Sequence, residues 1–191
     1  MNAPGDEPAY LELPLADFLD LTAARTPAPG GGAAVAVTVA LAASLSAMAA
    51  RFSTDHLPEA AALAERSNSL RDEAASLAQA DATAYGRVLA AKRGEESQNV
   101  REALLDAANV PLAVAGIGSE VARISARLVE KGNPNLKGDA ISAVLLAEAA
   151  VRAATALVEI NLSGAETGER LERAGELVRS AAEARRIVEG R

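Results

Sequence analysis

Residues 27–50 read PAPGGGAAVAVTVALAASLSAMAA. Two prolines and three glycines precede an apolar run in which only one threonine and two serines are polar. Alanine and leucine are among the best helix formers, so the run predicts a helix from Ala33 to Phe52 that begins directly after the glycines. The first N–H groups of a helix have no partner within it, which makes the glycine segment a candidate for binding an anion or a polar ligand.

The composition of the whole chain favours the same structural class. Of its 191 residues, 50% are apolar but only 2% are aromatic, so the core must consist mainly of alanine, leucine and valine. Small side chains let helices approach closely, and we therefore predict an all-α fold, a multihelical bundle of about six helices. The length fits one domain, which we place at residues 13–191, after a flexible N-terminal tail at residues 1–12.

Apolar periodicity, prolines and glycines divide this domain into helices. We expect them at Leu15–Arg25, Ala33–Phe52, Pro58–Lys92, Asn99–Lys131, Asp139–Leu162 and Glu166–Glu189. Pro111 should kink or split the fourth helix, because proline removes a backbone hydrogen bond. Asp139 is a good N-cap for the fifth, and Glu148 and Arg152 have the i,i+4 spacing of an ion pair.

The helix predicted at residues 33–52 is apolar nearly all round. In a protein dissolved in water this pattern indicates the centre of a bundle or a subunit interface, and we therefore expect a homodimer. The run is long enough to suggest a membrane span, but it is mostly alanine and no second span accompanies it, so we expect no membrane association. The N-terminus lacks the features of a secretory signal, which favours a cytoplasmic location.

Charge and rare residues narrow the ligand. A net charge of −7 disfavours nucleic acid as a partner and is more compatible with a cationic or small-molecule ligand. The absence of cysteine excludes disulfides, thiolate metal sites and a cysteine nucleophile. The single histidine, His56, makes a zinc site built on histidines implausible.

Several short segments occur in an order and spacing that resembles one known family. They are TPAPGGG at 26–32, DATAY at 81–85, VPL at 110–112, GNPNLKGD at 132–139 and INL at 160–162. Together they resemble the formiminotetrahydrofolate cyclodeaminase and methenyltetrahydrofolate cyclohydrolase family, which includes the cyclodeaminase domain of formiminotransferase-cyclodeaminase. The resemblance covers the chain from about Leu13 to Leu162.

The resemblance implies an all-helical homodimer that acts on a one-carbon-substituted tetrahydrofolate, with no metal or separate cofactor. We expect hydrolysis of methenyltetrahydrofolate to formyltetrahydrofolate. One alternative is a formiminotetrahydrofolate cyclodeaminase, which closes the methenyl ring and releases ammonia. Another is a catalytically inactive folate-binding or structural homodimer, because Ala33, Gly138 and Gln79 depart from the family pattern by lacking a hydroxyl or a carboxylate.

Asp81 and Asp139 are the candidate catalytic residues. The methenyl carbon shares a positive charge with two folate nitrogens, so a nearby carboxylate would stabilise the cation and take a proton from attacking water. Burial between alanine-rich helices would raise the pKa of such a carboxyl group toward neutrality. Helix capping by Asp139 and a solvated position for Asp81 are the plainer interpretations.

The candidate substrate-binding residues lie in several of the same segments. Pro29, Gly30, Gly31 and Gly32 form the first group. The backbone N–H groups of the three glycines could hold a folate carboxylate or a pterin oxygen, although a tight turn also explains this segment. The others are Tyr85, which could stack on the pterin; Asn133, Asn135 and Asn161, whose amides offer donors and acceptors; and Lys137, which could meet the glutamate tail. We expect the glycine and asparagine segments to converge on one acid-lined cavity, within a chain or across a subunit boundary.

Overall fold

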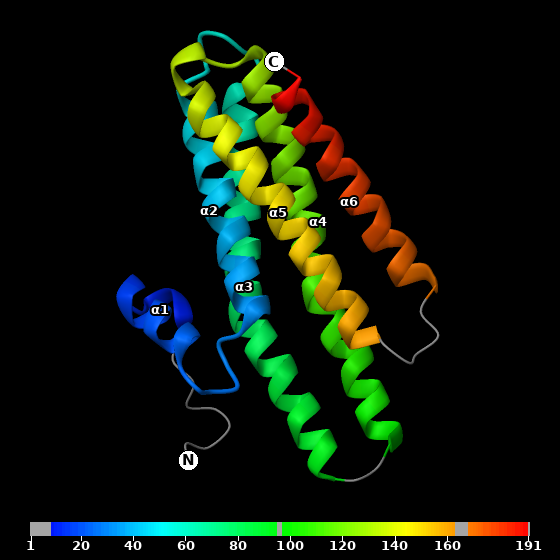
Figure 1. Cartoon of the computed structure of the whole chain (residues 1–191). Helices are drawn as coiled ribbons and strands as arrows, with labels where there is room; N and C mark the ends of the chain where they lie inside the picture. The colour runs from blue at the N-terminus through cyan, green and yellow to red at the C-terminus, as the bar shows by residue number, and fades with distance from the viewer. Residues whose placement is uncertain (1–8, 95–96, 163–167, 191) are drawn as a thin grey trace.

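The computed structural model describes residues 9–94, 97–162 and 168–190, and these form an elongated bundle of α-helices (Figure 1). The α-helices are α1 (Leu15–Ala23), α2 (Gly31–Arg51), α3 (Ala60–Arg93), α4 (Ser97–Lys131), α5 (Lys137–Leu162) and α6 (Gly168–Glu189). Two short 3-10 helices are η1 (Tyr10–Glu12) and η2 (Pro134–Leu136). Within the described ranges there is no β-strand, and the predicted all-α class and its six helices are confirmed.

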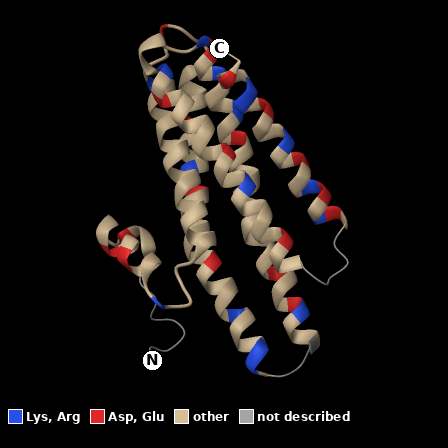
Figure 2. Cartoon of the chain, viewed as in Figure 1, with Lys and Arg blue, Asp and Glu red and all other residues tan. Residues whose placement is uncertain are grey.

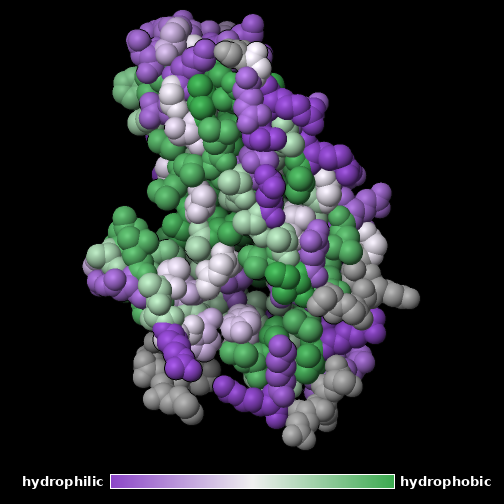
Figure 3. Space-filling view, in the orientation of Figure 1, coloured by the Kyte–Doolittle hydropathy of each residue, from purple (hydrophilic) through white to green (hydrophobic). Residues whose placement is uncertain are grey.

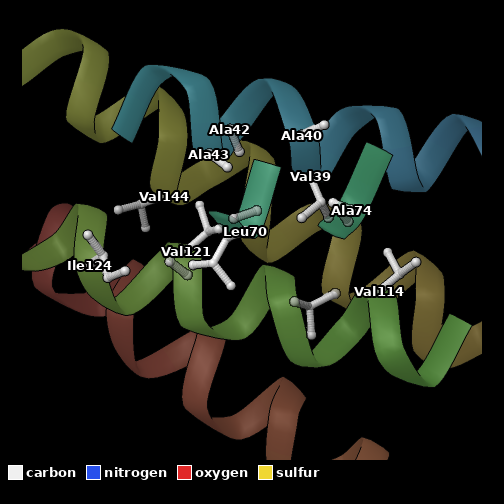
Figure 4. Packing of buried hydrophobic residues seen from close by; sticks show 14 of the residues in the cluster. Val39, Ala40, Ala42, Ala43, Leu70, Ala74, Val114, Val121, Ile124 and Val144 are labelled. Atoms are coloured by element: carbon white, nitrogen blue, oxygen red, sulfur yellow. The ribbon is translucent and has the colours of Figure 1, made fainter. Parts of the chain in front are cut away.

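The helix α4 lies at the centre of the bundle and packs against α2, α3, α5 and α6. The helix α2 packs mainly on α3 and α5. Figure 4 shows part of the core where these helices meet, with Val39 of α2, Leu70 of α3, Val121 of α4 and Val144 of α5 pointing toward one another. All four of these side chains are fully buried, as expected for an aliphatic core that contains almost no aromatic rings.

Small residues let α4 approach its neighbours. A Cβ atom at Gly118 would lie 2.8 Å from a methyl carbon of Val151 on α5 and 3.3 Å from one of Val39 on α2. Of the predicted kink or split at Pro111, the split does not occur, because α4 runs without interruption from Ser97 to Lys131. Proline removes a single hydrogen bond without ending the helix, and packing on four neighbouring helices offsets this loss.

The start of α5 also differs from the prediction. Asp139 lies in the first turn of α5, not at its N-cap, because η2 leads directly into a helix that begins at Lys137. The capping role falls to Asn133, whose side-chain oxygen accepts a hydrogen bond of 2.9 Å from the backbone N–H of Asn135. An acid in the first turn remains favourable, because it faces the positive end of the helix dipole.

The predicted Glu148–Arg152 ion pair does not form. Glu148 is buried, and its carboxylate lies 3.7 Å from the Nε atom of Arg185 on α6, whereas Arg152 is exposed. Sequence spacing alone favoured the neighbour on the same helix, but Glu148 points toward α6. The pair therefore helps to fix the position of α6 on the bundle, since a buried charge without its partner is costly.

The N-terminal segment is partly packed. Tyr10, within the stretch expected to be a flexible tail, is 5% exposed and meets the ring of Phe18 edge to face at a centroid distance of 5.9 Å. Its backbone N–H donates to the Oε1 atom of Gln79 on α3 at 3.3 Å. Residues 1–8 of the expected tail lie outside the described residues. Figure 1 shows α1 beside the bundle at the level where α2 begins.

In the described part of the chain, three helices are long and apolar enough to cross a membrane by length and composition alone: Gly31–Arg51, Gln98–Lys131 and Pro134–Leu162. The expectation that residues 33–50 are the only such segment is therefore wrong. In the most apolar 18-residue stretch of each helix, the share that is buried inside the bundle is 56%, 50% and 50% respectively. Tertiary packing thus accounts for about half of the apolar character, and the remainder lies on the outer surface.

Candidate active site

A cavity of about 320 Å³ lies where the start of α2, the middle of α3 and the end of α5 meet. Figure 3 shows the surface hollowed in this region, between the start of α2 and the end of α5. The residues that line the cavity are Pro27, Ala28, Gly30, Gly31, Gly32, Asp81, Ala84, Tyr85, Ala107, Leu157, Ile160 and Asn161. The cavity therefore unites the glycine segment with Asp81, Tyr85 and Asn161, as predicted from three separate parts of the sequence.

The carboxylate of Asp81 lies against the N-terminus of α2. It accepts a hydrogen bond from the backbone N–H of Ala33, one of the N–H groups that a helix leaves without an internal partner. A Cβ atom at Gly32 would overlap the Asp81 carboxylate, so this close approach requires glycine at position 32. The glycine segment thus lets an acid reach the positive end of a helix, beside the cavity.

The other side of Asp81 faces apolar residues. A small gap behind it is lined by Val110, Pro111, Val114 and Leu157, together with other neighbours. Burial raises the pKa of Asp81 above its ordinary value, and the hydrogen bond from Ala33 opposes this rise only in part. Val110, Pro111 and Val114 of α4 therefore help to form the apolar surroundings on this side of the carboxyl group.

Tyr85 and Asn161 border the same cavity from different helices. Tyr85 follows Asp81 by one helical turn on α3, which places both side chains on one face, and its side chain is 44% exposed. Asn161 is half-buried near the end of α5. Of the predicted glycine-segment residues, only Pro29 is absent from the cavity lining, because it is buried beneath the turn.

Sequence reasoning missed several lining residues, among them Ala107, Leu157 and Ile160. Leu157 precedes Asn161 by four residues on α5, so the helical repeat offered a signal for it once Asn161 was chosen. Ala107 had no such signal, because it is one alanine among many. Its carbonyl lacks the usual helical donor four residues on, since Pro111 has no N–H.

The asparagine loop, which is the GNPNLKGD segment at residues 132–139, lies at the other end of α2. The Asn133 side chain donates to the carbonyl of Phe52 at 2.9 Å, and its backbone N–H donates to the hydroxyl of Ser53 at 2.9 Å. Because α2 has 21 residues, its two ends are about 30 Å apart. Within one chain, therefore, the structure does not bring Asn133, Asn135, Lys137 and Asp139 together with Asp81 and the glycine segment.

The three departures from the family pattern fall in three different places. Ala33 is fully buried and does not line the cavity. Gln79 lies on the surface of a second cavity, and Gly138 is at the start of α5, at the far end of α2. Within one chain, none of these three residues lines the cavity that contains Asp81, so the departures from the family pattern leave that lining unchanged.

Comparison with known proteins places this arrangement in a family. Residues 14–179 match the family model described as formiminotransferase-cyclodeaminase. The chain belongs to this family. It is 31% identical to the methenyltetrahydrofolate cyclohydrolase of Methylorubrum extorquens, in an alignment that covers 77% of this chain and 78% of that protein. Its structure is similar to the crystal structure of formiminotetrahydrofolate cyclodeaminase from Thermotoga maritima, with a TM-score of 0.85, 29% identity and coverage of 94% of this chain and 98% of that chain.

Membership of the formiminotransferase-cyclodeaminase family confirms the resemblance drawn from the short segments. It assigns the chain to the cyclohydrolases and cyclodeaminases of folate one-carbon metabolism. The two named relatives carry out different reactions, so family membership alone leaves the individual reaction open.

Replacing Gly32 with alanine should lower kcat/KM for the folate substrate by about 10²-fold, because the added methyl group must displace the Asp81 carboxylate. Steady-state kinetics measures the change. Gly86→Ala on α3 is the control, since Gly86 does not line the cavity and a Cβ atom there also meets nothing within 4 Å. Equal losses in the two variants would contradict a specific role for the Gly32–Asp81 contact.

Proposed function

We propose that this protein is a methenyltetrahydrofolate cyclohydrolase, which hydrolyses methenyltetrahydrofolate to formyltetrahydrofolate. The observation that carries the proposal is the position of Asp81: a half-buried carboxyl group of raised pKa that borders a cavity at a helix N-terminus. The 31% identity to a protein named methenyltetrahydrofolate cyclohydrolase supports the choice of reaction.

The substrate is a cation whose positive charge is shared between one carbon and two nitrogens. The ionised Asp81 would stabilise this charge in a site of low polarity, where electrostatic attraction is stronger than in water. Its raised pKa brings the carboxylate closer to the basicity at which it can accept a proton near neutral pH. Backbone N–H groups of Gly31 and Gly32, at the start of α2, would bind a ring oxygen of the pterin.

In the proposed reaction Asp81 takes a proton from a water molecule as the water oxygen bonds to the methenyl carbon. One carbon–nitrogen bond of the five-membered ring then breaks while the new hydroxyl group becomes the formyl carbonyl. The departing nitrogen keeps its electron pair and receives a proton, so that one proton is released overall. The proposal includes no resident metal or separate cofactor.

The second candidate reaction is formiminotetrahydrofolate cyclodeamination, because the structural relative from Thermotoga maritima is named for it. The two reactions share the methenyl compound, as substrate of one and product of the other. Asp81 would stabilise the same cation in both, and the difference lies in whether water or ammonia enters or leaves.

Two assays on the purified protein decide between the reactions. We expect faster decay of the near-ultraviolet absorbance of methenyltetrahydrofolate than in buffer, and no release of ammonia from formiminotetrahydrofolate. Release of ammonia from formiminotetrahydrofolate would contradict the proposal and identify the protein as a cyclodeaminase. If the folded protein accelerates neither reaction but binds a folate in calorimetry, the inactive folate-binding alternative is correct.

We further propose that the protein works as a homodimer through the outer face of α2 and α5. Leu41 is 57% exposed, Phe52 is 61% exposed and Ile160 is 65% exposed, and Figure 3 shows green, apolar residues gathered along these helices. Charged residues are dense on α6 but nearly absent from α2, where Arg51 stands alone (Figure 2). A large exposed apolar face of this kind marks a contact surface.

The position of Leu41 suggests how two copies would pair. It lies midway between Gly31 and Arg51, so a two-fold axis beside Leu41 would set the α2 helices of two copies antiparallel. The end of α2 in one copy would then lie beside the start of α2 in the other. The asparagine loop, which is bonded to Phe52 and Ser53, would move with that end and bring Asp139 toward the cavity of the second copy.

The remaining partners follow from this proposal. A folate is the small-molecule partner, and the reaction requires neither nucleic acid nor a membrane. In a dimer the exposed part of α2 and α5 would be covered by the second copy, which accounts for their apolar surface without a bilayer. We propose a cytoplasmic location on the same basis.

A further inference from the structure

A second cavity, of about 570 Å³, lies between α3 and α4. Ala84 and Ala107 line both this cavity and the one that contains Asp81, so the two adjoin at these alanines. Small side chains at the junction leave space for a ligand to extend from one cavity into the other. The proposed reaction at Asp81 makes no use of the second cavity.

The second cavity is lined by both apolar and charged side chains. Ala80, Ala103 and Val110 provide apolar surface, and charged side chains enter from both helices: Arg87 from α3 and Asp106 from α4. Such a lining suits a ligand that has a flat apolar part and an ionised end.

Arg87 is the cationic group of this cavity. It forms no ion pair with any carboxylate in the described parts of the chain, in contrast to Arg66 and Arg71 on the same helix. The hydroxyl groups of Ser76 and Thr83 donate to carbonyls of their own helix and are therefore already engaged. An anionic ligand in this cavity would thus meet Arg87 as its principal binding group.

We propose that the second cavity binds the aminobenzoyl-glutamate part of the folate, with Arg87 pairing with a carboxylate of the glutamate. The inference rests on the proposed function, because it supposes that the pterin occupies the cavity beside Asp81. The benzoyl ring would lie on the alanines at the junction, and the glutamate would extend toward Arg87. A guanidinium group binds a carboxylate through two parallel hydrogen bonds, which makes Arg87 well suited to this role.

Asp106 opposes this binding through its negative charge. It lies on the α4 side of the cavity, so it would repel a glutamate carboxylate and favour a pose close to α3. Two substitutions in one cavity should consequently change the affinity for the same ligand in opposite directions. A purely structural role for these residues would not produce this pattern.

The test compares methenyltetrahydrofolate with methenyltetrahydropteroate, which lacks the glutamate. We expect Arg87→Ala to raise KM about tenfold for the first substrate, the loss expected for one charge-assisted contact, and to leave KM for the second unchanged. Asp106→Asn should lower KM for the glutamate-bearing substrate alone. Both variants should keep the wild-type kcat, because neither residue reaches the reacting carbon.

Arg179→Ala, an exposed substitution on α6 outside both cavities and outside the proposed dimer face, controls for the change in net charge. If Arg87→Ala changed KM equally for the two substrates, or for neither, the proposal that the glutamate binds at Arg87 (the tail site) would be overturned. If the wild-type protein turns over neither substrate, the proposed function has failed. In that case the affinity of the wild-type and Arg87→Ala proteins for folate and pteroate, measured by calorimetry, tests the tail site without catalysis.

Discussion

Replacing Asp81 with asparagine should reduce kcat/KM for methenyltetrahydrofolate by about 10²–10⁴-fold, the range typical for loss of a general base. In the wild-type protein kcat/KM should fall as the pH is lowered through the pKa of Asp81, because the protonated group can neither accept a proton nor stabilise the cation. Burial raises this pKa, so the fall should occur at higher pH than for an exposed aspartate. A pH profile of wild-type kcat/KM measures it.

The same substitution should leave the melting temperature at pH 7 unchanged or higher. Because the pKa of Asp81 is raised in the folded state, the folded chain binds this proton more tightly than the unfolded chain does. Stability therefore falls as the pH rises through the interval between the unfolded and folded pKa values, and the ionised group is a cost at neutral pH. Asparagine removes the charge but retains an oxygen that can accept the N–H of Ala33.

Glu65→Gln is the matched control for the Asp81 variant, because it removes one carboxylate from an exposed position on the same helix. It should keep both activity and melting temperature. If Asp81→Asn retained activity within a few-fold of wild type, or lost activity together with a lower melting temperature, Asp81 would have a structural role instead of a catalytic one.

Mixing two inactive variants should restore activity if the site is shared between subunits. In the proposed antiparallel dimer, Asp81 of one copy and Asp139 of the other serve one site. Asp81→Asn and Asp139→Asn homodimers would both be inactive, but a mixed dimer would contain one site with both aspartates intact. Random exchange makes half of the dimers mixed, so about a quarter of all sites should recover, an increase on the order of 10²-fold over either variant alone.

The experiment requires subunit exchange, by unfolding and refolding the mixture or by co-expression with two different tags. Size-exclusion chromatography with light scattering confirms the dimer before and after mixing. Activity that stays at the level of the separate variants would contradict a shared site. If the Asp139→Asn protein kept full activity, Asp139 would have no catalytic role and would only stabilise the first turn of α5.

Most of the fold follows from local rules. Alanine-rich runs, prolines and glycines fixed the six helices within a few residues of the observed boundaries. The errors arose where tertiary contacts outweighed local preference. Pro111 lies inside a helix that packs on four neighbours and continues past it, and Glu148 pairs with a residue on α6 that is 37 positions away instead of with Arg152 on its own helix.

The candidate site was predictable in part for a different reason. Unusual residues such as the glycine segment, an acid among small residues on α3 and Asn161 stand out from an alanine background, and the fold brings them to one cavity. The asparagine loop stands out equally, but its distance from that cavity depends on the length and direction of α2, which the short segments do not encode. Ala107 and Ala84 could not be found, because their importance lies in being small.

The contact between Gly32 and Asp81 also constrains how this protein can diverge. A side chain gained at position 32 must displace the carboxylate at position 81, so a lineage that acquires one moves or loses this acid. A natural homologue that carries any residue larger than glycine at the equivalent of position 32 should therefore have abandoned this chemistry while keeping the scaffold.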